Sequence, residues 1–141
     1  MAAEKGQVAV MFALVLALFL SGLVALVGDV ILLYDAAGRY DNGALVGAQA
    51  GASQVDRGLL REGQVALDPG RASAICTEAA SVTSGLAAGE VRCTVSPDRR
   101  SVTSHVSHRV PLVFAAYGPG LTITRDHTGT IAVGESQGTS P

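Results

Sequence analysis

The apolar positions divide the chain into one continuous hydrophobic stretch near the N-terminus and a longer region of short, periodic patterns. Residues from Gln7 to Gly28 carry no charge and are rich in Leu, Val, Ala and Phe. At a rise of ~1.5 Å per residue, this stretch is about 33 Å long as a helix, close to a hydrocarbon core of roughly 30 Å. The apolar run resumes after Asp29, so residues 7–34 are predicted to form a transmembrane helix.

A cleaved secretory signal is the alternative interpretation of this segment. Such a signal has an apolar region of about 7–15 residues and ends at an Ala-x-Ala-like site. The stretch in this chain is longer and offers no convincing site of that kind, which favours a retained anchor. Lys5 precedes the span and the residues after it are mainly acidic, a bias that leans towards a cytoplasmic N-terminus and an extracytoplasmic C-terminal domain.

The segment that follows, residues 35–62, is dense in Ala and Gly. No proline occurs before Pro69, so the pattern predicts one long helix from Gln7 to about Leu60, broken at most near the glycines and without a sharp turn between Val30 and Ala44. Residues 1–6 form a short leader-like segment ahead of this helix.

Three glycines in this extension recur at a spacing of four, as Gly43, Gly47 and Gly51. In a helix they form a smooth stripe that another helix can approach closely, so we expect a helix-packing surface that binds a second subunit. The alternative is that the glycines only weaken the helix, at roughly 1 kcal/mol each relative to Ala.

The remaining pattern predicts a small α+β domain over residues 63–134. A turn at Leu67–Gly70 is followed by apolar residues at helical spacing: Ala72, Ile75, Cys76, Ala79, Val82 and Leu86. The period then changes to two, with a strand at Val91–Val95, a turn at 96–100 and a second strand from Val102 to Phe114. Residues 121–133 suggest either a final strand pair or one bulged strand. The expected fold is one helix on an antiparallel sheet of three or four strands, carried on the long helix, and residues 135–141 are expected to be a flexible tail.

Cys76 and Cys93 both lie on apolar faces of their predicted elements, where the helix covers the sheet. A disulfide between them would stabilise a small core by about 3 kcal/mol in the chain-entropy model. The alternative is two buried free thiols. The membrane anchor makes an oxidising compartment plausible and favours the disulfide, which in turn favours an extracytoplasmic domain.

Composition and motifs narrow the function classes. Apolar residues make up 48% of the 141 residues, charged residues 16%, and the formal net charge is −2, so no basic excess exists to bind nucleic acid. His105 and His108 are three apart on a predicted strand and point to opposite faces, which does not suit a metal site even with His127 added. We find no nucleophile motif, phosphate-binding loop or paired carboxylates, and we therefore expect no catalysis, cofactor, metal or small-molecule substrate.

The N-terminal residues resemble a known family. The run from Lys5 to Leu14, the apolar stretch, the Gly28-Asp29-Val30 step and the Ala/Gly-rich helix ending at residues 47–52 are similar to the start of TadE/TadG-like proteins. These proteins are components of the bacterial Tad (Flp-type) pilus assembly system, a branch of the type IV pilus machinery. The later strands, with residues 110–114 and 121–124, resemble the sheet of TadE-like minor pilins.

This resemblance implies a pilin-like fold and cleavage by a prepilin peptidase after Gly6, which would leave Gln7 as the new N-terminus. Many such pilins carry a Glu five residues after the cut, where this chain has Met11. TadG-like relatives without that Glu stay membrane-anchored, so processed and unprocessed forms are both open.

The function expected from the sequence is a non-enzymatic, single-pass membrane component of a pilus or its assembly machinery, a minor pilin or pseudopilin. Its partners would be the membrane, other pilin or pilus-assembly subunits, and the prepilin peptidase. The alternative is a bitopic envelope protein outside any pilus, whose extracytoplasmic domain binds a partner.

Overall fold

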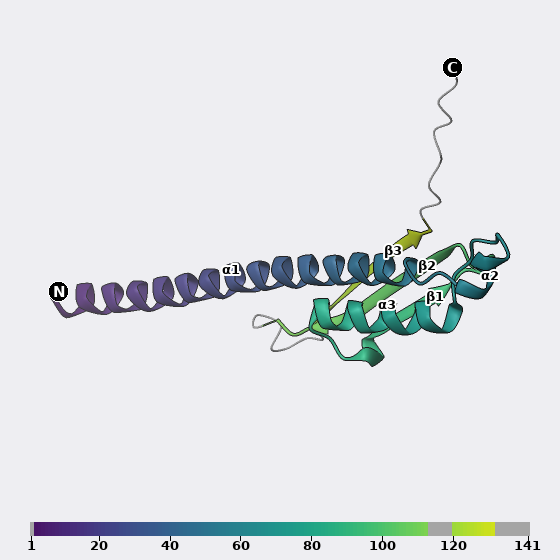
Figure 1. Ribbon diagram of the computed structural model, residues 1–141. Coiled ribbons are helices and arrows are strands. Elements are labelled where there is room, and N and C mark those ends of the chain that lie inside the picture. The colour runs from purple at the N-terminus through teal and green to yellow at the C-terminus, as the bar shows by residue number, and fades with distance from the viewer. Residues whose placement is uncertain (1, 113–119, 132–141) are drawn as a thin grey trace, which may run out of the picture. The chain divides into compact units, whose positions relative to one another are not determined.

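The computed structural model describes residues 2–112 and 120–131, and within them the chain has the expected α+β fold. A long N-terminal helix leads to a small domain with a second helix and a three-stranded sheet (Figure 1). The predictions for Phe114 and for the tail at 135–141 lie outside the described residues.

The long helix, α1, runs without interruption from Ala2 to Ala52. Its continuity follows from the absence of proline and from the unbroken series of small and apolar residues. The predicted absence of a turn between Val30 and Ala44 is confirmed. Gly6 and Gln7 lie inside this helix, and cleavage between them stays a prediction.

The helix does not continue unbroken to Leu60: α1 ends at Ala52, directly after Gly51, so the break lies near the glycines, where the prediction allowed one. Val55 instead forms an isolated antiparallel bridge with Leu67, and the Asp56 N–H donates to the Ala66 carbonyl at 2.8 Å. The Asp56 carboxylate then caps a separate short helix, α2 (Arg57–Arg61), by accepting from the Gly58 N–H at 2.8 Å. A tertiary pairing and a strong N-cap therefore override the helical pattern of residues 53–60.

The second long helix, α3, spans Pro69–Ser84 and has sequence signals at both ends. The Asp68 carboxylate accepts from the Gly70 and Arg71 N–H groups at 3.1 Å each, and Pro69 takes the first helical position. Gly85 ends the helix in the left-handed conformation, with φ of 72°. A 3-10 turn, η1 (Ala88–Glu90), leads into the sheet.

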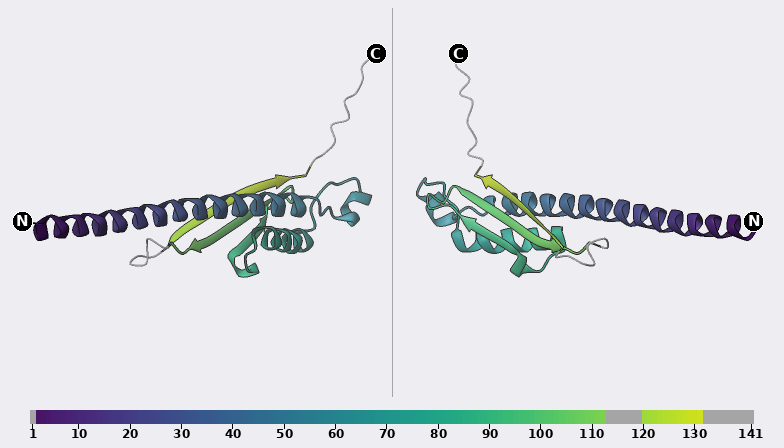
Figure 2. Two further views of the ribbon diagram at one scale, coloured as in Figure 1. Left: turned by 90° about the vertical axis from the view of Figure 1, so that its left-hand side faces the viewer. Right: turned by 180° about the vertical axis from the view of Figure 1, so that it is seen from behind.

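The sheet has the order β1-β2-β3, with β1 at Val91–Val95, β2 at Ser101–Val110 and β3 at Leu121–Thr130 (Figure 2). β1 and β2 pair antiparallel, with Cys93 opposite Ser104. The predicted parity of β2 is confirmed: alternate residues are buried, namely Val102, Ser104, Val106 and Val110. The final segment forms one strand and not a strand pair.

Two compact units make up the chain. One contains Met1–Ala36 and Arg109–Leu121; the other contains Ala37–His108 and Thr122–Pro141. The second unit holds the core cluster of Leu67, Ala72, Cys76 and Val102, with Cys93, Val95 and Ile131 packed on it. The apolar helix segment belongs to the first unit.

Candidate helix-packing site

The glycine stripe of α1 is occupied by α3 of the same chain. A Cβ built on Gly43 would lie 2.8 Å from the Ser84 Cβ, and one built on Gly47 would lie 2.6 Å from the Ala80 Cβ. A Cβ on Gly51 would lie 2.9 Å from the Cys76 Cβ. Real Cβ atoms do not approach this closely, so only glycine fits at these three positions. We call the contact between these glycines and α3 the glycine seam.

The α3 side of the seam is also built from small residues at a spacing of four. Its buried residues are Ala72, Cys76, Ala80 and Ser84. The Ser84 hydroxyl donates to the Ala80 carbonyl at 2.7 Å, so this buried polar group has a hydrogen-bond partner. Two small-residue stripes of matching period thus allow two helix backbones to come into direct contact.

This geometry corrects two expectations. The stripe packs against a helix, as predicted, but that helix belongs to the same chain, so this surface is not free to bind a second subunit. The predicted buried face of α3 is wrong at Val82, which is 77% exposed, because Ala80 and Ser84 face the seam in its place. Small residues in α3 recur every four positions, as the glycines of the stripe do. This shared period is the feature of the sequence that could have identified α3 as the partner of the stripe.

A disulfide joins Cys76 of α3 to Cys93 of β1, with the Cα atoms 6.1 Å apart. Cys76 is fully buried and Cys93 is partly buried. Since the carbonyl of Cys76 would lie 2.9 Å from a Cβ on Gly47, the cross-link attaches to α3 in the middle of the seam. The cysteine pairing expected from the sequence is therefore present.

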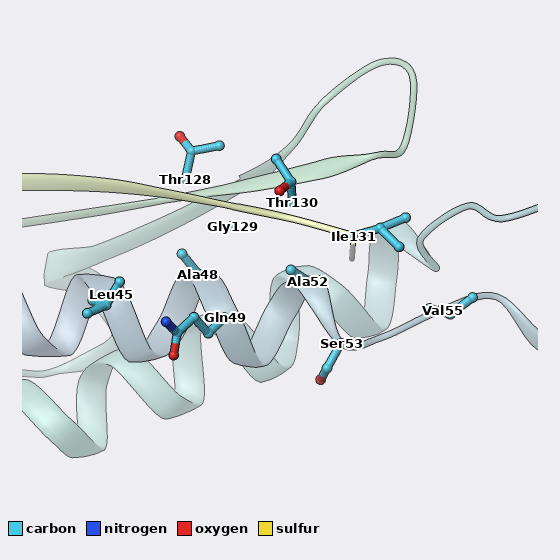
Figure 3. A pocket seen from close by; sticks show the side chains of 10 residues that line it. All are labelled: Leu45, Ala48, Gln49, Ala52, Ser53, Val55, Thr128, Gly129, Thr130 and Ile131. Atoms are coloured by element: carbon cyan, nitrogen blue, oxygen red, sulfur yellow. The ribbon is translucent and has the colours of Figure 1, made fainter. Parts of the chain in front are cut away.

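The second half of α1 also contacts the edge strand β3. A Cβ on Gly129 would lie 2.4 Å from the Ala48 carbonyl oxygen, so the strand crosses the helix at a glycine. Figure 3 shows Ala48 and Ala52 pointing towards this strand. Beside the crossing is an open groove of about 480 Å³, lined by α1 residues such as Leu45 and by the end of β3.

Each of the three histidines contacts a carboxylate from another element. His105 pairs with Asp126 between β2 and β3, and His108 pairs with Glu90 of η1. The His127 Nε2 atom lies 3.0 Å from the Asp41 carboxylate, which links β3 to α1. These pairs were not predicted, because they depend on the register of the sheet and on where α1 crosses it.

Two side chains of the second unit, those of Glu90 and Tyr40, have shifted pKa values. The hydrogen bond with His108 holds the pKa of Glu90 below its usual value. Burial raises the pKa of Tyr40, whose ring meets that of His108 edge-on, with 5.7 Å between the centroids. On the outer sheet face the Thr103 and Thr128 hydroxyls lie 3.0 Å apart. Of these contacts, the threonine pair joins β2 to β3, whereas the other two join β2 to η1 and to α1.

Among residues 2–112 and 120–131 there is no group of three or more His, Cys, Asp or Glu side chains that could hold a metal ion. The buried polar side chains of this part of the chain all have hydrogen-bond partners. The features that the described residues do offer are the seam, the disulfide and the exposed apolar helix.

The segment from Gln7 to Ala52 contains the candidate membrane span, by length and composition. No residue of its most apolar stretch is buried; Val24, for example, is 70% exposed. Asp29, the single charge of residues 7–34, is buried, with 4% of its surface exposed. One helix near the N-terminus is therefore long and apolar enough to cross a membrane.

Comparisons with protein families, with curated proteins and with solved structures find no match to this chain. The family resemblance noted from the sequence therefore rests on the residues of the chain alone.

Proposed function

We propose that this protein is a non-enzymatic, membrane-anchored subunit of a Tad-type pilus or of its assembly machinery, related to minor pilins and pseudopilins. The observation that carries the proposal is that two segments of the same helix differ in what covers them. Residues 7–34 expose large apolar side chains, whereas the glycine stripe at 43–51 is already packed against α3 within the domain. The surface left for lipid or for other subunits is thus the apolar segment.

The orientation in this proposal has the N-terminus in the cytoplasm and the small domain outside. The Cys76–Cys93 disulfide supports it, because such bonds persist in oxidising compartments. The buried state of Asp29 also supports a span, since a carboxylate exposed to hydrocarbon would be costly. Gly6 and Gln7 are the proposed site of the prepilin peptidase.

The proposal is tested by shearing fibres from cells that express the tagged full-length chain. We expect the chain in the sheared fraction together with the major pilin. The intact mass of that chain would show loss of residues 1–6 and two fewer hydrogens than the dithiol. Recovery only in the membrane fraction, from cells whose fibres have been collected, would exclude a fibre subunit; if that chain also forms no cross-link to a pilus-assembly subunit, it is a bitopic envelope protein outside the pilus.

The contact surface is tested by photocrosslinking in the same cells. A photoreactive residue at Phe12, which is 68% exposed on the apolar segment, should cross-link to another pilus subunit. The matched control is the same residue at Val82, which is also exposed but lies on α3. Equal cross-linking from both positions would contradict an assembly surface on the apolar helix.

A further inference from the structure

The disulfide lies where α3 meets α1. A Cβ on Gly51 would be 2.9 Å from the Cys76 Cβ, and Cys76 is fully buried against this part of α1. Through Cys93, the same bond attaches α3 to β1. The covalent link to the sheet therefore starts from a residue of α3 that also packs against the glycine seam.

The other fully buried residues of α3 provide little apolar surface to hold it there, and the larger Ile75 side chain is half-buried. The buried positions besides Cys76 are Ala72, Ala80 and Ser84. Hydrophobic stabilisation scales with the apolar area removed from water, so these small side chains contribute little each. Val82 is exposed and adds nothing to the contact.

The sheet, by contrast, has its own contacts with α1. Gly129 of β3 lies against the Ala48 carbonyl, and the His127 imidazole contacts Asp41 at 3.0 Å. β1 is paired with β2 along its whole length, from Val91 opposite Val106 to Val95 opposite Val102. These contacts do not involve α3, so they do not depend on the disulfide directly.

Reduction of the Cys76–Cys93 bond also crowds the two sulfur atoms. Two thiols occupy more volume than one disulfide, because non-bonded sulfur atoms cannot approach as closely as bonded ones. Cys76 has no spare space on the α1 side, where even an added Cβ would be too close. Movement of Cys76, and with it α3, away from the seam would relieve this crowding.

We propose that the Cys76–Cys93 bond is a redox-sensitive control of the glycine seam. In the oxidised chain α3 closes on α1; in the reduced chain α3 leaves the seam while the sheet stays on α1. Closure by glutathione disulfide is a two-electron exchange. The two cysteine thiols give up two protons and two electrons to form the Cys76–Cys93 bond, and glutathione disulfide becomes two glutathione thiols.

The consequence is a chain whose seam closes only after the domain reaches an oxidant. Until then the glycine face of α1 and the small face of α3 are both open.

Hydrogen exchange of the full chain in detergent micelles tests this inference. On treatment with a phosphine reductant, we expect backbone amides of α3 to exchange faster by on the order of 100-fold, the scale set by loss of a cross-link across 17 residues. Amides of β1 and β2 should change far less, and those of residues 10–27 should not change. After removal of the phosphine, addition of glutathione disulfide should restore protection.

The paired variant Cys76→Ala with Cys93→Ala separates loss of the bond from side effects of the reductant. It should exchange rapidly in α3 under all redox conditions and should not respond to the reductant. Equal α3 exchange in the oxidised and reduced chain would overturn the proposal. So would an equal loss of protection in β1, β2 and α3, which would make the bond a general staple of the domain.

Discussion

The two halves of α1 have the same secondary structure and opposite environments. From Val8 to Tyr34 the helix carries large apolar side chains, and nearly all of them are exposed. From Tyr40 to Ala48 it carries mostly small side chains, and after Tyr40 the buried positions recur in pairs, Gly43 with Ala44 and Gly47 with Ala48. Hydrophobicity alone therefore does not decide which half is covered by protein. What decides it is whether a neighbouring element can come close, and that depends on side-chain size.

The two halves of the helix are stabilised in different ways, one by transfer of large side chains to hydrocarbon and the other by close packing of backbones. Large exposed side chains gain free energy from hydrocarbon, at about 0.8 kcal/mol per buried methylene. Glycines gain nothing by transfer, but they permit backbone contact and close packing. The two halves of one helix can thus be tested by changing the size or polarity of single residues.

The largest change in the free energy of unfolding is expected from Gly47→Leu. The new side chain would meet the Ala80 Cβ, the Cys76 carbonyl and the Ser104 hydroxyl, all within 3.2 Å of a Cβ at this position. Although Leu favours an isolated helix by roughly 0.8 kcal/mol over Gly, overpacking should lower the free energy of unfolding by at least about 3 kcal/mol. Urea unfolding of the full chain in micelles measures this change.

The matched control is Gly38→Leu, because a Cβ at Gly38 meets nothing within 4 Å. It should leave the domain as stable as the original chain or slightly more stable. Equal destabilisation by both variants would show that helix distortion, and not the seam, is responsible.

The next largest effect is on membrane insertion of the apolar half of α1, residues 7–34. Val24→Lys places a charge in the middle of the proposed span and should disfavour insertion by about 3 kcal/mol, a fall in membrane partitioning on the order of 100-fold. Val82→Lys is the control, because its side chain is exposed to a similar degree but on α3. Carbonate extraction of membranes distinguishes the two. If Val24→Lys is retained as fully as Val82→Lys, residues 7–34 do not span the bilayer.

A smaller effect is expected where β3 crosses α1. Gly129→Ala would place a Cβ 2.4 Å from the Ala48 carbonyl oxygen, and relief of that clash should lower the free energy of unfolding by about 2 kcal/mol. Gly89→Ala, at a position with open space, should change it by less than about 0.5 kcal/mol. Thermal melting of the two variants provides the comparison; an unchanged melting temperature for Gly129→Ala would exclude a tight crossing.

The smallest effect concerns acid stability. The hydrogen bond with His108 lowers the pKa of Glu90, so the folded state binds fewer protons than the unfolded state near the usual Glu value of about 4.3. The resulting stabilisation is present above that value and is lost as the pH falls through the lowered pKa. Glu90→Gln should therefore slightly lower the melting temperature at pH 6, and the difference from the original chain should shrink as the pH is lowered further.

Glu78→Gln removes the same charge from an exposed position of α3 and serves as the control. A pH-independent difference between Glu90→Gln and the original chain would contradict the role given to the pair with His108.

Local patterns predicted most of the fold. The long helix, the α3 segment, the parity of β2 and the approach of the two cysteines all follow from periodicity within single elements. The end of α1 did not follow, because it depends on Val55 pairing with Leu67 twelve residues along the chain. Propensity over residues 53–60 is compatible with a helix, and a tertiary contact decides against it.

The candidate site was predicted in part. The spacing of Gly43, Gly47 and Gly51 identified a packing surface, but a glycine stripe has no side chains with which to specify its partner. The partner became evident only from the backbone of α3 lying against it. The histidine–carboxylate pairs depend on sheet register in the same way and could not be read from spacing alone.

The glycine seam also constrains how the sequence can change over generations. Every single-nucleotide missense change of a glycine codon gives a residue with a Cβ, so no conservative step away from glycine exists. At positions 43, 47 and 51 each such change meets backbone or Cβ atoms of α3, whereas at Gly28, Gly38 and Gly89 it enters open space. Descendants of this gene should therefore keep the first three glycines and vary at the other three, and the α3 residues that face the seam should vary only among the smallest side chains.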